Sequence, residues 1–238
     1  MTWLWRICFS GLWLMPAWCA SVKGNVVLTD SRDPGVRHNK DFSGVVVWLE
    51  PTNGDAPGRV PPHHFRMVQK EKHFTPHVLA IPVGSAVDFP NKDPIFHSVF
   101  SNYDGQIFDL GLYRPYTSKD VVFKRAGIVR VFCNIHPTMS AVIAVLDTPW
   151  FDVSKGSGDF EIRDVPPGNY TLHIFHERAT DETLNALVRP VGVEKAAPRV
   201  LPLIRISETG YIPAPHKNKW DKDYPPVIDD QPAYRPNQ

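Results

Sequence analysis

The chain has 238 residues, and its 26 lysine and arginine side chains nearly balance 25 aspartate and glutamate side chains. Such a balance gives no electrostatic case for nucleic-acid binding, and the length suits one large or two small domains. Proline is abundant, at 24 residues, and helix-period patterns are scarce. We therefore expect an all-β protein built from strands and turns.

The first segment is typical of a secretory signal, which we predict over residues 1–20. Arg6 precedes an apolar run, residues 7–15, that is too short to span a bilayer. Small residues then favour cleavage near Cys19. A Sec-type signal would export the mature chain to the periplasm, and a membrane would be a partner only if the leader stayed uncleaved or were lipidated at Cys19.

Strand patterns occupy both sides of the central part of the chain. We expect the first strands in residues 22–60, which end in a segment rich in glycine and proline. Residues 148–206 are expected to add more, including a hairpin that joins 157–165 to 170–176 through a Pro-Pro-Gly turn. Residues 207–238 are polar and rich in proline, and we expect an extended tail.

The central segment, residues 63–147, has short strands separated by turns at intervals typical of a β-sandwich. Two residues separate Cys133 from His136, and two more separate His136 from Met139. A lone histidine, His97, lies upstream. Two imidazoles, one thiolate and one thioether are the ligands of a blue-copper site, a trigonal His₂Cys plane with a weak axial Met. These four residues are the candidate metal ligands.

Cys133 indicates a metal for a second reason. The chain has three cysteines, and Cys8 and Cys19 lie in the predicted leader. An exported mature chain would then hold one cysteine with no disulfide partner, which a metal would explain. The alternatives are that Cys133 is a small buried apolar residue and that Met139 only packs in the core.

Residues 63–147 resemble a cupredoxin, the small Greek-key copper domain of amicyanin and plastocyanin. The resemblance rests on a Phe-x-Pro strand, on the pattern Gly-x-x-Val-x-Phe-x-Asn-x-Asp before the first histidine, and on the short amicyanin-type Cys-His-Met loop. It implies one bound copper ion. His97 and His136 would each bind it through one ring nitrogen, Cys133 through sulfur, and Met139 axially.

Neighbouring positions both match and depart from the cupredoxin pattern. Asn91 and Asp93 match positions that shape the turn before the first ligand. Many cupredoxins carry Asn directly after that histidine, whereas this chain has Ser98, whose hydroxyl can still donate a hydrogen bond. Multicopper oxidases and copper nitrite reductases bridge their centres through histidines beside the cysteine. Because Phe132 and Asn134 occupy those positions here, we do not expect such an enzyme.

The outer segments resemble a carboxypeptidase-regulatory-like β-sandwich, which is related in shape to transthyretin. The motif that carries this resemblance is the alternating run Gly158–Tyr170. The cupredoxin unit would be inserted between residues 22–60 and 148–206 of this second sandwich. Bacterial exported proteins with this layout are often labelled methylamine utilization proteins, a label that says little about the substrate.

The other histidines give weaker signals. We expect His77 to be structural, and His173 and His176 to point to opposite faces of one strand, so that they do not share an ion. His38 and His216 have no recognisable context in the sequence.

The function that these features favour is outer-sphere transfer of single electrons by a periplasmic type 1 copper protein, without enzyme activity. Four protein ligands would leave no position open for a substrate. A redox partner protein, such as a c-type cytochrome or a dehydrogenase, would be required. The alternatives are a copper carrier, a partner- or carbohydrate-binding module without a redox role, and a structural adhesion module with a vestigial site.

Overall fold

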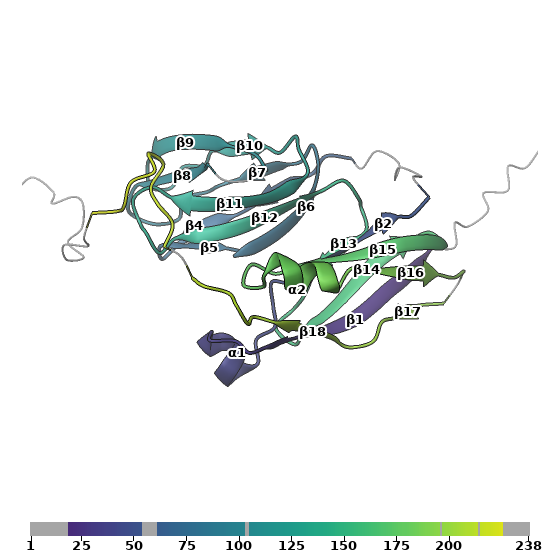
Figure 1. Ribbon diagram of the computed structural model, residues 1–238. Helices are drawn as coiled ribbons and strands as arrows, with labels where there is room; N and C mark the ends of the chain where they lie inside the picture. The colour runs from purple at the N-terminus through teal and green to yellow at the C-terminus, as the bar shows by residue number, and fades with distance from the viewer. Residues whose placement is uncertain (1–18, 54–60, 103–104, 196, 214, 226–238) are drawn as a thin grey trace, which may run out of the picture.

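The computed structural model describes residues 19–53, 61–102, 105–195, 197–213 and 215–225 (Figure 1). Most of the predicted leader and the end of the tail lie outside these residues. Strands dominate the described part, which has two helices of six residues each, α1 (Pro34–Asn39) and α2 (Asp181–Ala186). The predicted all-β fold class is confirmed. Neither helix of the described part is long and apolar enough to cross a membrane.

A five-stranded sheet forms one layer of the central unit. Its strands, in spatial order, are β6 (Val78–Pro82), β12 (Ser140–Leu146), β11 (Gly127–Cys133), β8 (His97–Ser101) and β9 (Phe108–Tyr113). Neighbouring strands are antiparallel except β6 and β12, which run parallel. A parallel neighbour requires a crossover connection, so β6 and β12 cannot be joined by a simple hairpin.

Shorter strands complete the central unit. They are β10 (Asp120–Val122), β7 (Ala86–Asp88) and β3 (His64–Arg66) in one sheet, and β4 (Val68–Lys70) with β5 (His73–Thr75) in a pair. One buried cluster receives side chains from both sheets, for example Val87 and Phe89 from one side and Val131 and Ile143 from the other. The central unit is therefore a sandwich with its own core, as the resemblance to a cupredoxin implies.

Strand β12 is buried on both faces. Ala141, Ile143 and Val145 contribute to the core of the central sandwich, whereas Val142 and Ala144 face the opposite way into a separate buried cluster. A strand that is buried on both faces is expected to be a continuous apolar run rather than an alternating one. This explains why residues 141–146 contain no polar side chain.

Two further sheets enclose a second core. One contains β14 (Asp159–Val165), β1 (Ala20–Thr29), β17 (Arg199–Val200) and β18 (Ile204–Ser207); the other has the order β13 (Phe151–Val153), β2 (Val46–Pro51), β15 (Gly168–Phe175) and β16 (Arg189–Val193). Their inward side chains, such as Val22, Leu49, Ile162 and Leu172, form one buried cluster. We propose the division into an inserted unit, 63–147, and an enclosing unit on this basis. The family of the second sandwich stays a prediction.

A third buried cluster joins the two sandwiches. Val46 from β2 packs there with residues of β6 and β12, namely Val78, Ala80, Val142, Ala144 and Leu146. Trp48 and Phe175 pack against this cluster, and Phe175 also borders the second core. Figure 1 shows the corresponding contact between the layer that contains β6 and β12 and the layer that contains β2 and β13. The apolar contact holds the two units against each other.

Several elements do not follow from the local pattern. We predicted no individual strand at β9 or β13 and no helix at α1 or α2. The predicted hairpin between 157–165 and 170–176 is wrong, because β14 and β15 belong to different sheets. Asp33 caps α1, whose first residue is Pro34, and Thr180 caps α2. These are ordinary helix-start signals, but a six-residue segment is too short to show the sequence periodicity that distinguishes a helix from a turn.

Candidate metal centre

Pairing of β8 with β11 places two of the predicted ligands at one end of the central sandwich. Cys133, the last residue of β11, lies opposite Val99, two residues after His97 at the start of β8. In an antiparallel pair the end of one strand meets the start of the other. Both side chains are fully buried.

A tight loop places the third predicted ligand, His136, beside the other two. The Cys133 N–H donates to the Met139 carbonyl at 3.0 Å, and the Met139 N–H donates to the His136 carbonyl at 3.1 Å. These bonds close the seven-residue loop and direct His136 back over Cys133. The Met139 side chain is buried in the same cluster as Cys133. Its predicted role as axial ligand stays a prediction.

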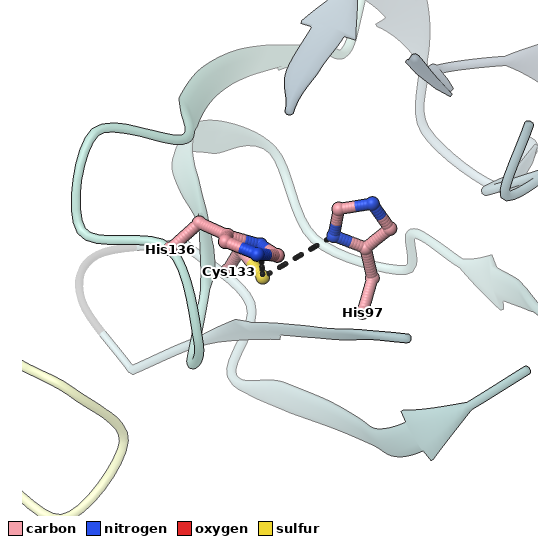
Figure 2. A group of neighbouring side chains, drawn as sticks. All are labelled: His97, Cys133 and His136. Carbon is pink, nitrogen blue, oxygen red and sulfur yellow. Dashed lines mark hydrogen bonds between the residues drawn. The ribbon is translucent and has the colours of Figure 1, made fainter. Parts of the chain in front are cut away.

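The three donor atoms converge (Figure 2). Cys133 Sγ lies 3.6 Å from His97 Nδ1 and 3.5 Å from His136 Nδ1, and the centres of the two imidazole rings are 4.9 Å apart. Donors that lie 2.0–2.3 Å from an ion at the centre of a trigonal plane would be separated by about 3.6–3.8 Å. The observed spacing therefore fits a small ion between the three side chains. No other group of three His, Cys, Asp or Glu donors this close occurs in the described residues.

A buried carboxylate orients His97. The His97 Nε2–H donates to Asp93 Oδ2 at 2.9 Å, which leaves the Nδ1 lone pair directed at the sulfur. Burial lowers the pKa of His97 despite the neighbouring carboxylate, so the neutral ring is favoured. A neutral imidazole is the form that binds a metal.

Backbone groups in turn hold Asp93. Its carboxylate accepts the N–H groups of Glu71 and Lys72 at 2.5 and 3.0 Å. Burial alone would raise the pKa of Asp93, but the bonds from Lys72, His97 and Glu71 outweigh burial and hold it below its usual range. The Asn91 side chain accepts the Asp93 N–H and donates to two carbonyls. Asn91 and Asp93 thus fix the turn before His97.

Burial raises the pKa of the Cys133 thiol, although the backbone N–H groups of Ser98, Ile135 and His136 oppose this. A bound cation would displace the thiol proton, because a coordinating thiol loses its proton outright. The Ser98 carbonyl accepts the Asn134 N–H at 2.8 Å, which braces the two ligand segments through the backbone. The Ser98 hydroxyl, which we expected to help, has no partner among the described residues.

The sequence interpretation missed the C-terminal neighbours of this centre. Tyr224 donates its hydroxyl to the Cys133 carbonyl at 2.7 Å, and His216 stacks on Phe132. The sequence around these two residues does not indicate their contacts, because Tyr224 lies 91 positions after Cys133 in the chain. The extended tail expected over residues 207–238 stays a prediction. In its described part, Glu208 lies beside the second sandwich, whereas Lys219 and Tyr224 contact the central sandwich.

The remaining histidines lie elsewhere. His77 pairs with Glu177, His173 with Glu50, and His176 with Glu208. His173 is also stacked on Trp48, whereas His176 is buried, so the two do not share a partner.

No family model matches the chain. A curated relative, the methylamine utilization protein MauL of Methylorubrum extorquens, is 46% identical over 56 residues, which cover 23% of this chain and 49% of the relative. The chain thus aligns with about half the length of that relative.

Several solved structures resemble part of this chain, with low TM-scores. Amicyanin from Paracoccus versutus is 20% identical, with 37% of this chain and 85% of amicyanin covered and a TM-score of 0.33. A purple cupredoxin from Nitrosopumilus maritimus is 21% identical, with 34% and 99% covered and a TM-score of 0.31. A copper-containing nitrite reductase from Thermus scotoductus is 22% identical, with 51% and 28% covered and a TM-score of 0.34.

Proposed function

We propose that the cupredoxin-like unit of this chain binds one copper ion in a type 1 site and transfers single electrons. His97, Cys133 and His136 would be the equatorial ligands and Met139 the axial one. The convergence of one sulfur and two imidazole nitrogens at the buried end of a sandwich carries the proposal. Thiolate and imidazole together favour copper, which supplies one-electron chemistry when bound.

The surrounding residues are suited to a centre that changes charge without changing shape. Asp93 fixes the ring of His97, the Ser98 carbonyl holds the Asn134 N–H, and the Cys133–Met139 hydrogen bond closes the loop. Packed side chains on the core side limit movement of the donors. Such a site would hold its ligand residues in place in both oxidation states.

Four protein ligands around the ion favour an electron carrier over an enzyme. With four protein ligands no position is open to a substrate, so electrons would pass through the ligands to a docked protein. His97 and Cys133 are fully buried, whereas His136 is partly exposed, which makes His136 the route to the surface. We propose export to the periplasm and a redox partner protein, a c-type cytochrome or a dehydrogenase. The name of the MauL relative favours a setting in methylamine utilization.

The visible absorption spectrum tests this function. Protein loaded with Cu(II) should show an intense thiolate-to-copper charge-transfer band, and Cys133→Ser should lose it. A chain that begins at Cys19 offers a matched control, because Cys19 is an exposed free cysteine and Cys19→Ser should keep the colour. A Cys133→Ser protein as coloured as the wild type would contradict the assignment.

Electrochemistry separates electron transfer from the copper-carrier alternative. A reversible one-electron couple and fast self-exchange are expected of a centre whose ligands stay in place. A slow and irreversible couple would instead favour a carrier, because release of the ion requires the ligands to rearrange.

A further inference from the structure

Residues 215–225, here called the C-terminal strap, lie against the end of the central sandwich that holds the donors. In Figure 1 this yellow segment lies at the end of the central sandwich near β8 and β9. The strap contains a built turn. The buried Asn218 side chain accepts the N–H groups of Trp220 and Lys222 at 3.0 and 3.1 Å, and the backbone N–H of Asn218 donates to the Lys222 carbonyl. The strap therefore has a defined shape of its own.

Two hydrogen bonds connect the strap to the ligand loop. The Tyr224 hydroxyl donates to the Cys133 carbonyl at 2.7 Å, and the Lys219 N–H donates to Asn134 Oδ1 at 2.9 Å. The N–H of the same Cys133–Asn134 peptide donates to the Ser98 carbonyl at 2.8 Å. This peptide is thus held on one edge by β8 and on the other by Tyr224.

Contacts outside the loop fix the strap in place. The His216 ring stacks on Phe132, with ring centres 4.2 Å apart and planes at 25°, and the Tyr224 ring meets the imidazole edge-on at 5.2 Å. Lys219 Nζ pairs with Asp109 Oδ2 on β9 at 2.8 Å. Burial lowers the pKa of His216, so the stack is made by a neutral ring. The strap is therefore anchored on β9, on β11 and on the ligand loop.

We propose that Tyr224 is a positioning residue of the metal centre. By holding the peptide that follows Cys133, it limits rotation about the Cys133 backbone and so keeps the sulfur directed between His97 and His136. The hydroxyl contacts none of the proposed metal-donor atoms: its partners are the Cys133 carbonyl and, at 3.3 Å, His216 Nδ1. The inference rests on the proposed copper function for its spectroscopic readout but not for its readout in metal-free protein.

The test is Tyr224→Phe, which removes one hydroxyl and keeps the ring against His216. Tyr211→Phe is the matched control, because Tyr211 belongs to the same tail but lies beside Asp30 and Glu208 of the second sandwich. In metal-free protein, hydrogen exchange of the amides from Asn134 to His136 should be about three- to tenfold faster in Tyr224→Phe, as expected when the hydrogen bond to the Cys133 carbonyl is lost. Tyr211→Phe should exchange these amides at the wild-type rate.

The copper-loaded protein gives a second readout. Tyr224→Phe should keep the charge-transfer band but shift its maximum and the reduction potential, because the sulfur is less tightly oriented. Deletion of residues 215–238 should produce at least as large a shift. Exchange rates and spectra of Tyr224→Phe that equal those of the wild type would overturn the inference.

The two proposals fail in different ways. A wild-type protein that takes up copper without a charge-transfer band would overturn the proposed function. The exchange comparison in metal-free protein would still decide whether Tyr224 holds the loop.

Discussion

At the scale of single residues, the centre is defined by which atom each side chain presents. His97 presents Nδ1 to the sulfur because its Nε2–H is bonded to Asp93. Without that bond the ring could flip or carry its proton on the wrong nitrogen. Outer partners of this kind orient ligands and raise their basicity, so Asp93 belongs to the centre although it would not touch the ion.

Met139 gives the residue-scale prediction. Met139→Leu should keep the copper and raise the reduction potential, because a lost axial donor disfavours Cu(II) more than Cu(I). A tenfold preferential loss of Cu(II) affinity corresponds to a rise of about 60 mV for a one-electron couple. Voltammetry of the loaded protein measures this shift.

The core supplies a matched control for that measurement. Met67 is also fully buried in the core of the central sandwich, so Met67→Leu makes the same chemical change. Both substitutions roughly conserve volume and should cost less than about 1.5 kcal/mol of stability. Equal potentials in Met139→Leu and wild type would place the axial ligand elsewhere.

At the scale of elements, strand ends carry the chemistry and the charged contacts. His77 directly precedes β6, and Glu177 lies two residues after β15. The two ring nitrogens of His77 face the Ser140 carbonyl at 3.1 Å and Glu177 Oε1 at 2.7 Å. Because both partners are hydrogen-bond acceptors, the doubly protonated ring can donate one N–H to each of them. The hydrogen bond to Glu177 raises the pKa of His77 despite partial burial and the nearby Arg178.

This contact predicts a pH dependence of stability. Because the pKa of His77 is higher in the folded than in the unfolded state, protonation of His77 stabilises the folded protein. This stabilisation is complete at pH values below the unfolded-state pKa near 6.5, and it is lost as the pH rises through the higher folded-state pKa. His77→Gln should therefore lower the free energy of unfolding at pH 5.5 by about 0.2–1 kcal/mol, and by less at pH 9. Urea unfolding of metal-free protein at the two pH values measures the difference.

His63→Gln is the control for the pH effect, because His63 is exposed and its ring contacts only Phe65 among the aromatic side chains described. It should leave the pH dependence unchanged. A loss of stability in His77→Gln that is equal at both pH values would show that the ring only packs there.

At the scale of the whole molecule, the two sandwiches share a buried apolar contact. Val46 and Val47 are neighbours on β2 and are both fully buried, yet Val46 faces the shared cluster and Val47 faces the second core. Because successive side chains of a strand point to opposite faces, β2 contributes both to the second core and to the contact between the sandwiches. The contact makes the second sandwich a fixed support for the central sandwich.

Calorimetry tests this coupling. Wild-type protein should unfold in one transition, because neither unit can lose its fold without exposing the shared cluster. Val46→Asp places a charge in that cluster and should split the transition into two.

The neighbouring residue is the control. Val47→Ala should keep one transition and lower the free energy of unfolding by about 1–3 kcal/mol, since it removes only core contacts. Two separate transitions in the wild-type protein would contradict a coupled structure.

The sequence by itself determined the class of fold and the candidate donors. Period-two patterns are local, so the alternating run predicted over 157–165 contains the observed strand Asp159–Val165. The spacing of Cys133, His136 and Met139 is local too, and a closed loop follows from it. Short elements such as β13, with three residues, carry too little pattern to be found in this way.

Only the tertiary structure decided what surrounds the donors. Pairing of β8 with β11 brought His97 to the sulfur, and the fold of the tail brought Tyr224 to the Cys133 carbonyl. The sequence also did not reveal that β12 is apolar throughout because a second sandwich covers its outer face. Such contacts join segments that are far apart in the chain. They depend on how the sheets pack together, and a one-dimensional pattern does not contain that information.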